Sequence, residues 1–249
     1  METTVNLKSK DGYTIYGVLN TAPKKSDTLL ILVHGLTGDL TDHIFFNAAR
    51  FFPKKGIDTY RFNLYDGRKG GRSLVSSSVR THAEDLNQVL KKFRKEYRHI
   101  AVAGHSLGGP SVVTADTALM DSIILWDPTP MPSKKDVSEG MKSPVRFNKS
   151  LNAYVSEWNF SFLMGKEMMD EYDTLKPVQR IKNVHAPVKI ICAEKLGNAK
   201  GGKEYFKEAN SPKEYAVIKG ATHCFDESET EDQLFSETLD WVKKWSKKG

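Results

Sequence analysis

The sequence is poor in cysteine and in long apolar runs. Its 249 residues include 2 Cys, too few for a disulfide framework or for the common four-ligand zinc site. The longest apolar run is Leu29–Val33, far short of the ~20 residues that a membrane-spanning helix needs. These absences argue against a disulfide-stapled secreted domain, a structural zinc protein and stable insertion into a membrane.

The first residues of the sequence do not predict a secretory signal. Residues 1–20 are polar and alternating, with an acidic start and no apolar central region. We therefore expect a cytoplasmic protein whose thiols are reduced.

Arginine is scarce relative to lysine. The chain has 37 Lys plus Arg, of which 9 are Arg, against 31 Asp plus Glu, so its formal net charge is +6. Four lysines near the C-terminus supply most of this excess: Lys243, Lys244, Lys247 and Lys248. Because base and phosphate recognition favours the arginine fork, the charge indicates a solvated lysine-rich surface, and we expect no nucleic-acid partner.

The sequence does contain an alternation of apolar strands and amphipathic helices. Residues 3–20, with the turn pair Asp11-Gly12, predict a β-hairpin. Strands are expected over 29–33, 57–64, 99–103, 122–126, 188–192 and 215–218, and helices over 42–55, 79–97, from 107 onward and over 229–246. Such alternation predicts an α/β domain with a parallel sheet covered on both faces.

One stretch interrupts the alternation. Residues 128–180 show no strand pattern and are rich in Met, aromatic residues and Pro. A stretch this long inside a compact domain is usually functional. We therefore expect residues 1–127 and 181–249 to form the core and residues 128–180 to form a cap.

The most informative motif is Gly104-His105-Ser106-Leu107-Gly108, between an expected strand and an expected helix. This is the G-x-S-x-G pattern in the strand–turn–helix setting of a nucleophilic serine. The turn must be tight for the serine oxygen to project above the sheet, and its glycines let the flanking backbones approach each other. Ser106 is the expected nucleophile.

Two further loops supply the other parts of an acyl-transfer site. His34-Gly35-Leu36-Thr37-Gly38 follows strand 29–33, and the backbone N–H groups of Leu36 and Leu107 are the expected oxyanion donors. His223 follows the last strand and is the expected general base, because only this histidine combines that position with the order Ser before His. We expect His34 to have a structural role.

The motifs HGLTG, GHSLGG and GATH occur in an order that resembles the α/β-hydrolase superfamily. The chain is most similar to small bacterial serine esterases and monoacylglycerol-lipase-like members, from the N-terminal hairpin to the last helix. The resemblance implies an α/β-hydrolase fold: a mostly parallel eight-stranded sheet with an N-terminal antiparallel hairpin, helices on both faces, and a small cap after strand 6.

The chain departs from this family at the acid of the triad. The family usually has an Asp after strand seven, where this chain has Leu196. Some members place the acid after strand six, so we favour Asp127, with Glu194 as the alternative acid. Asn198 is a weaker candidate because it carries no charge, and a site without a working acid is a further alternative.

Together these motifs predict a carboxylesterase-type serine hydrolase. It would cleave small to medium acyl or aromatic esters through an acyl-enzyme on Ser106, without a metal or organic cofactor. Thioester, amide or peptide hydrolysis on the same triad is an alternative. So is a non-catalytic binding protein that keeps the fold. The expected partner is a small-molecule ester, and the oligomeric state does not follow from the sequence.

The candidate substrate-binding residues are His105, Trp158, Phe162 and Met164. The apolar residues of the cap are equally suited to forming its own core. We expect Cys192 and Cys224 to be buried, reduced thiols near the active site.

Overall fold

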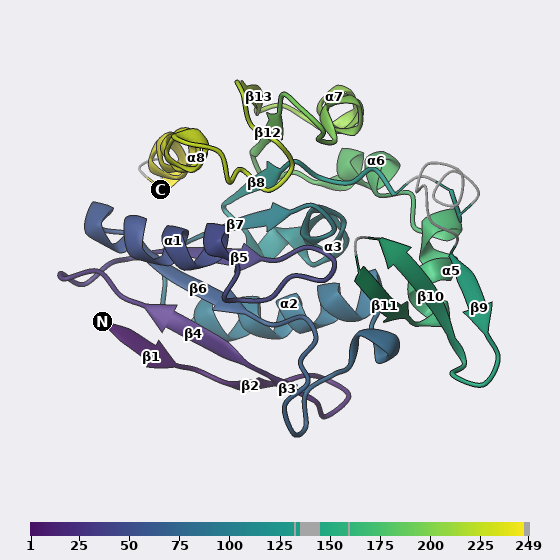
Figure 1. Ribbon diagram of the computed structural model, residues 1–249. Coiled ribbons are helices and arrows are strands. Elements are labelled where there is room, and N and C mark those ends of the chain that lie inside the picture. Colours follow the sequence, from purple (N-terminus) through teal and green to yellow (C-terminus); the bar gives the residue numbers. More distant parts are fainter. Residues whose placement is uncertain (132, 135–144, 159, 247–249) are drawn as a thin grey trace.

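A central eight-stranded sheet organises the computed structural model, which describes residues 1–131, 133–134, 145–158 and 160–246 (Figure 1). The strand order is β1-β4-β6-β5-β7-β8-β12-β13. These strands are β1 (Glu2–Thr4), β4 (Gly17–Asn20), β5 (Thr28–Val33), β6 (Asp58–Phe62), β7 (His99–His105), β8 (Ser122–Trp126), β12 (Val188–Ala193) and β13 (Lys213–Ile218). The mostly parallel sheet with helices on both faces confirms the predicted fold class.

Antiparallel pairing is confined to one edge of this sheet. β1 pairs with β4 and β4 with β6 in antiparallel register, whereas every pairing from β6 to β13 is parallel. The predicted N-terminal hairpin forms between β2 (Leu7–Lys8) and β3 (Thr14–Ile15). Its turn contains Gly12 at φ +91°, a conformation that glycine adopts without steric cost.

Alternate residues of the central strands face two different cores. In β5, Leu30 and Leu32 join a cluster beneath α1 (His43–Phe51) and α8 (Thr230–Ser246). Leu29, Ile31 and Val33 face the opposite cluster, which the remaining core helices cover. These helices are α2 (Val79–Phe93), α3 (Gly108–Thr114) and α7 (Ala199–Glu208).

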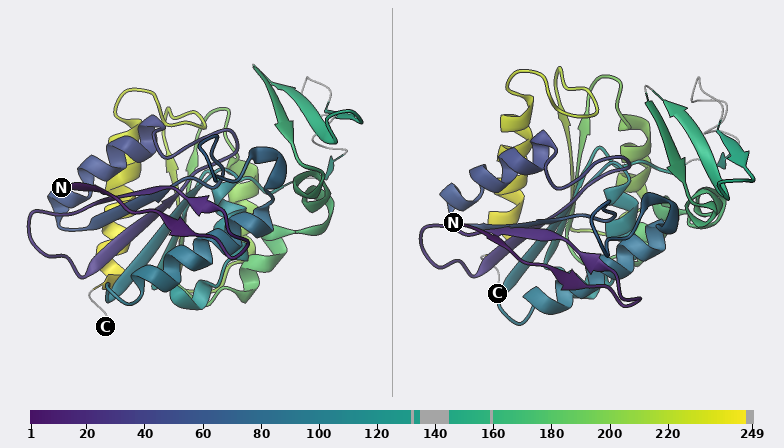
Figure 2. Two further views of the ribbon diagram at one scale, coloured as in Figure 1. Left: turned by 90° about the horizontal axis from the view of Figure 1, so that it is seen from below. Right: turned by 60° about the horizontal axis from the view of Figure 1, so that its bottom comes forward.

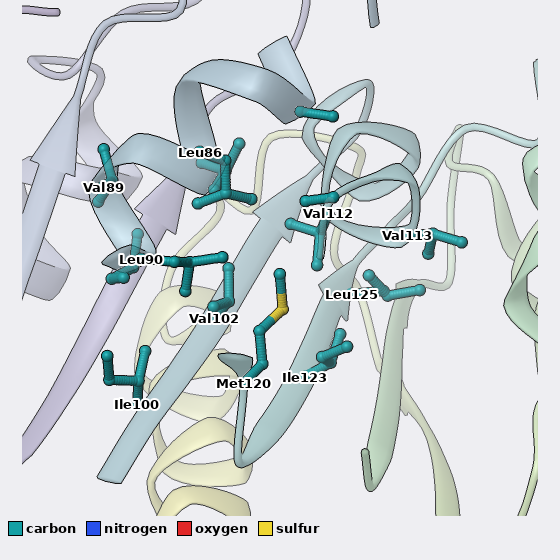
Figure 3. Close-up of a cluster of buried hydrophobic side chains, with 14 of the residues drawn as sticks. Leu86, Val89, Leu90, Ile100, Val102, Val112, Val113, Met120, Ile123 and Leu125 are labelled. Atoms are coloured by element: carbon teal, nitrogen blue, oxygen red, sulfur yellow. The ribbon is translucent and has the colours of Figure 1, made fainter. Parts of the chain in front are cut away.

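Figure 3 shows part of the second cluster, where α2 and α3 pack on β7 and β8. Leu86 and Leu90 of α2 lie over Val102 of β7, and Val112 of α3 lies between the two strands and α2. This burial of apolar side chains fixes α3, and with it the turn before α3, on the sheet.

The stretch between β8 and β12 contains strands, so the prediction that it has none was wrong. β9 (Arg146–Asn148), β10 (Ala153–Trp158) and β11 (Phe160–Met164) form an antiparallel sheet in the order β11-β10-β9. α5 (Lys166–Thr174) and α6 (Pro177–Arg180) follow it. Both views of Figure 2 place this small sheet beside α5, at one edge of the molecule. Its aromatic and β-branched residues are typical of strands, and the prediction for residues 128–180 did not take this preference into account.

Short 3₁₀ turns complete the regular structure, at Pro53–Lys55, Leu74–Ser76, Thr117–Leu119 and Ile181–Asn183. In the described part of the chain, no helix has the length and apolar character needed to cross a membrane.

Candidate active site

Ser106 lies in a strained turn between β7 and α3. Its φ is +53°, in the left-handed region that side chains other than Gly, Asn and Asp seldom occupy. A Cβ on Gly104 would lie 2.6 Å from the carbonyl oxygen of Gly108, and a Cβ on Gly108 would overlap the carbonyl oxygen of Val33. Both glycines therefore permit the close approach of strand and helix that the G-x-S-x-G motif predicted.

Ser106, His223 and Asp127 form one hydrogen-bonded chain. The hydroxyl oxygen of Ser106 lies 2.9 Å from Nε2 of His223. Nδ1 of the same ring lies 2.5 Å from Oδ2 of Asp127. With Nδ1–H donating to the carboxylate, Nε2 is left free to accept the serine proton, which is the arrangement that nucleophilic catalysis requires.

Asp127 is completely buried, and backbone N–H groups hold its carboxylate. Asn198 N–H donates to Oδ2 at 2.9 Å, and Ala193 N–H donates to Oδ1 at 3.2 Å. A Cβ on Gly197 would lie 2.8 Å from Oδ2, so the absence of a side chain there lets the loop close over the carboxylate. These contacts compensate for the removal of the carboxylate from water.

The alternative acid, Glu194, does not contact His223. Its Oε2 accepts the backbone N–H of Gly220 at 2.9 Å, so it ties the end of β12 to the turn before His223. Leu196, at the position where the family usually has its acid, is 90% exposed. Of the carboxylates considered in the sequence, the structure thus brings Asp127 to the histidine.

Two other histidines of the motifs have their hydrogen bonds within the protein. His34 is buried, and its Nε2 accepts Leu64 N–H at 3.0 Å while its Nδ1 bonds the carbonyl oxygen of Gly35 at 2.8 Å. Burial lowers the pKa of His34 to about 4, so the ring is neutral. His34 thereby fixes the loop after β5, in line with the structural role expected for it.

His105 supports the loop that carries His223. Its Nε2–H donates to the carbonyl oxygen of His223 at 2.8 Å. Burial, and then the nearby His223 ring, lower the pKa of His105 to about 3, so it remains a neutral donor. His105 also lines the cavity described below, and its role as a substrate-binding residue stays a prediction.

The loops of both expected oxyanion donors, Leu36 and Leu107, adjoin Ser106. Gly35 packs so closely on Ser106 that a Cβ there would lie 2.9 Å from the serine Cβ, which brings Leu36 to the site. Within the residues that the structure describes, neither Leu36 N–H nor Leu107 N–H donates to another protein group. Both are thus available to a substrate oxygen.

A cavity of about 610 Å³ opens beside Ser106. Its lining includes Leu36, Leu107, Thr129 and Tyr172, together with His223. Its volume lies in the range typical of small-molecule sites, ~300–1,000 Å³.

Two of the apolar residues proposed to bind substrate, Phe162 and Met164, pack away from the cavity lining. Met164 is 1% exposed and packs in a cluster with Val79 and the α5 methionines, and Phe162 packs against the same cluster. Neither is among the residues found to line the cavity. The side chain of Trp158 lies outside the described part of the structure.

Tyr172 is a site residue that the sequence analysis missed. It comes from α5, within residues 128–180, and lines the cavity, while Met168 and Met169 beside it form apolar core. Its helical spacing places it on the buried face of α5, so treating residues 166–174 as an amphipathic helix would have predicted that it is buried. The sequence did not indicate which buried side chain of this helix would line the cavity.

The two cysteines differ in exposure. Cys192 is buried in the core, whereas Cys224 is exposed and lines the cavity next to His223. The expectation that both are buried was therefore wrong for Cys224, because it follows His223 on a loop at the surface. Both are free thiols.

The sheet order and the nucleophile turn define the α/β-hydrolase fold. Residues 23–130 match a protein family described as "Putative serine esterase (DUF676)". This match includes Ser106 and Asp127 but stops before His223. A search of the curated proteins finds no match.

Solved structures of esterases share the fold over nearly the whole chain. Est1E from Butyrivibrio proteoclasticus, with ferulic acid bound, is 17% identical, with a TM-score of 0.83 over 98% of this chain and 100% of that chain. The esterase domain of a Rhodothermus marinus protein is 15% identical, with a TM-score of 0.77 over 98% and 99% of the two chains. Dienelactone hydrolase from Anabaena variabilis is 12% identical, with a TM-score of 0.70 over 98% of each chain. At such identities the likeness establishes the fold, and with the family match it supports ester hydrolysis in general.

Proposed function

We propose that this protein is a carboxylesterase-type serine hydrolase with Ser106 as nucleophile, His223 as base and Asp127 as acid. The observation that carries the proposal is the hydrogen-bonded chain from Ser106 through His223 to the buried Asp127. This chain sits on the strained turn that presents the serine oxygen. Asp127 fixes the ring tautomer and stabilises the positive charge that the ring acquires.

In the first half of the reaction, the oxygen of Ser106 attacks the ester carbonyl carbon and its proton moves to Nε2 of His223. The carbonyl oxygen becomes an oxyanion, which accepts hydrogen bonds from Leu36 N–H and Leu107 N–H. Each such donor is worth ~10²–10³ in rate. When the tetrahedral intermediate collapses, the bond to the leaving oxygen breaks and His223 gives that oxygen its proton.

In the second half, water replaces the alcohol. His223 takes a proton from water, which attacks the acyl-enzyme carbonyl and forms a second oxyanion in the same hole. Collapse breaks the bond to Ser106, and the serine oxygen recovers its proton from His223. The products are a carboxylic acid and an alcohol.

The size and lining of the cavity support small to medium esters. A volume of about 610 Å³ lined by both apolar and polar groups suits an acyl or aromatic group of moderate size better than a polymer. The Butyrivibrio neighbour binds ferulic acid, an aromatic acid, which makes aromatic acyl esters a sensible part of any substrate panel. Residues 128–180 act in this proposal as a cap, since they supply Tyr172 to the cavity.

A non-catalytic role is the alternative that the lack of an acid after strand seven would favour. The hydrogen bond between Asp127 and His223 supports the catalytic proposal over this alternative. No feature of the described residues favours thioester or amide hydrolysis over ester hydrolysis.

A fluorophosphonate probe and a substrate panel test the proposal. The wild type should be labelled, and Ser106→Ala should not be. Turnover should be measured for p-nitrophenyl esters of increasing acyl length, aromatic acyl esters, acyl thioesters and anilides. Labelling without hydrolysis of any ester would reject the esterase assignment, and absence of labelling would reject the nucleophile.

A further inference from the structure

Tyr172 is a polar side chain buried at the edge of the proposed active site. It is 6% exposed and lies on α5, where its ring packs in one apolar cluster with Leu107, Met168 and Leu175. It also lines the cavity that contains Ser106. The ring is therefore held rigidly by packing, while part of the side chain faces the space that a substrate would fill.

The hydroxyl of Tyr172 forms no hydrogen bond with the residues that the structure describes, and its oxygen is not among their fully buried unpaired polar atoms, so it is open to the cavity. Other buried tyrosines do form such a bond: the hydroxyl of Tyr60 donates to Val5, that of Tyr97 to Asp58 and that of Tyr205 to Thr129. Because the Tyr172 oxygen is not fully buried, water can pair with it in the empty cavity. A substrate that displaces this water either replaces the hydrogen bond or leaves the phenol unpaired at a cost of ~1–3 kcal/mol, so the hydroxyl is suited to a polar group of a ligand.

The charge state of Tyr172 favours donation. Burial raises its pKa to about 12, so the phenol keeps its proton at neutral pH. A neutral phenol offers one O–H donor and acceptor lone pairs, and it can therefore bond a hydroxyl, an ether or a ketone.

The proposed mechanism separates the two halves of the ester. His223 protonates the leaving alcohol, so the alcohol lies on the side of His223. The side chains of Leu107 and Tyr172 share one cluster and both line the cavity. We therefore place the acyl group in the part of the cavity that Leu107 and Tyr172 line.

We propose that Tyr172 is a specificity-determining residue that selects esters whose acyl group carries a neutral oxygen substituent, by hydrogen bonding that substituent. This inference rests on the proposed function. An acyl group that ends in hydrocarbon would leave the phenol unpaired in a dry site, whereas a hydroxyl or keto group would pair with it.

The test compares matched esters that share the p-nitrophenol leaving group. One pair is the 3-phenylpropanoate and the 3-(4-hydroxyphenyl)propanoate, and the other is the hexanoate and the 5-oxohexanoate. For wild type we expect kcat/KM to favour the oxygenated member of at least one pair by about tenfold or more. In Tyr172→Phe, kcat/KM for the oxygenated ester should lie within about twofold of kcat/KM for its hydrocarbon partner, as in an enzyme that does not select between them. Because the two esters are compared within one variant, a general loss of activity cancels.

Tyr97→Phe is the matched control, since it removes a hydroxyl bonded to Asp58, outside the cavity. It should retain the wild-type preference. The inference is overturned if wild type prefers neither oxygenated ester, or if the preference survives in Tyr172→Phe. Hydrolysis of p-nitrophenyl acetate, whose acyl group is very short, reports separately on the proposed function. Turnover of acetate without the preference overturns the inference alone, while no turnover of any ester overturns both.

Discussion

Replacing Asp127 with Asn tests the assignment of the triad acid with little change in shape. The carboxylate is fully buried and contacts Nδ1 of His223 at 2.5 Å and Asn198 N–H at 2.9 Å. An amide in its place is neutral and has an oxygen on one side only. If the oxygen faces the backbone N–H groups, the amide NH₂ faces His223.

The size of the effect follows from the tautomer of His223. An NH₂ group beside Nδ1 favours the ring with its proton on Nε2, which then cannot accept the proton of Ser106. Loss of the correct tautomer and of the countercharge is worth ~10⁴ in kcat in a triad of this kind. At 1.36 kcal/mol per tenfold, that corresponds to about 5 kcal/mol of transition-state stabilisation.

The assay is kcat on a p-nitrophenyl ester, with thermal unfolding measured in parallel to exclude a folding defect. Glu194→Gln is the matched control, because Glu194 bonds Gly220 N–H and not His223. We expect the control to lose less than about tenfold, as it weakens only one hydrogen bond near the surface. The reasoning is refuted if the two variants lose similar activity, or if Asp127→Asn keeps its rate while remaining folded.

Three further predictions concern the turn, the thiols and the cap. Gly108→Ala should lower the free energy of unfolding, measured by urea denaturation, by at least about 2 kcal/mol, because its Cβ overlaps a β5 carbonyl oxygen. Gly67 has open space around it, so Gly67→Ala should stay within about 0.5 kcal/mol of the wild-type free energy of unfolding. A bulky maleimide should label Cys224 but not Cys192 in the native protein. Because Cys224 lines the cavity, this labelling should also inhibit ester turnover. Equal labelling of both thiols would contradict the structure. Glu171 accepts the first two backbone N–H groups of α2, and burial raises its pKa above the ordinary value near ~4.3. Because the pKa is raised in the folded state, the contribution of this carboxyl to the free energy of unfolding is present at low pH and is lost as the pH rises. The free energy of unfolding of wild type should therefore fall relative to that of Glu171→Gln from about pH 4 upward. A difference between the two proteins that does not change with pH would contradict this.

The fold and the strained turn that carries Ser106 could be predicted because local signals and global topology agree. Leu29–Val33 is wholly apolar, as a strand buried on both faces must be, and the structure covers it on both faces. The G-x-S-x-G motif likewise carries part of its own geometry, since Gly104 is required by the backbone of Gly108 four residues later. Gly108 is required by a distant contact, with the backbone of Val33 at the end of β5, and there the prediction relied on the known geometry of the motif.

The cap could not be predicted in the same way. Its strands pair only with each other, in a small sheet where β10 lies between β9 and β11, and their side chains are shared between surface and core. The alternation was therefore too weak to distinguish strands from an irregular apolar segment. The place of Tyr172 depends on how α5 docks beside Leu107, which is a tertiary contact with no local signal.

The position of Asp127, the proposed acid, follows from the pairing of two neighbouring strands. β8 and β12 are neighbours in parallel register, with Trp126 opposite Ile191, so both strands end at the same edge. Asp127, one residue beyond β8 and bonded through its N–H to the carbonyl of Ile191, therefore reaches the region usually served by the strand-seven loop. The end of β12 and the loop after it supply no carboxylate to His223. Instead, the backbone N–H groups of Ala193 and Asn198 donate hydrogen bonds to the Asp127 carboxylate. These two donors and Gly197 between them all contact the Asp127 carboxylate, whereas the side chain at position 196 is 90% exposed. In the proposed site the β12 loop therefore holds the acid instead of supplying it.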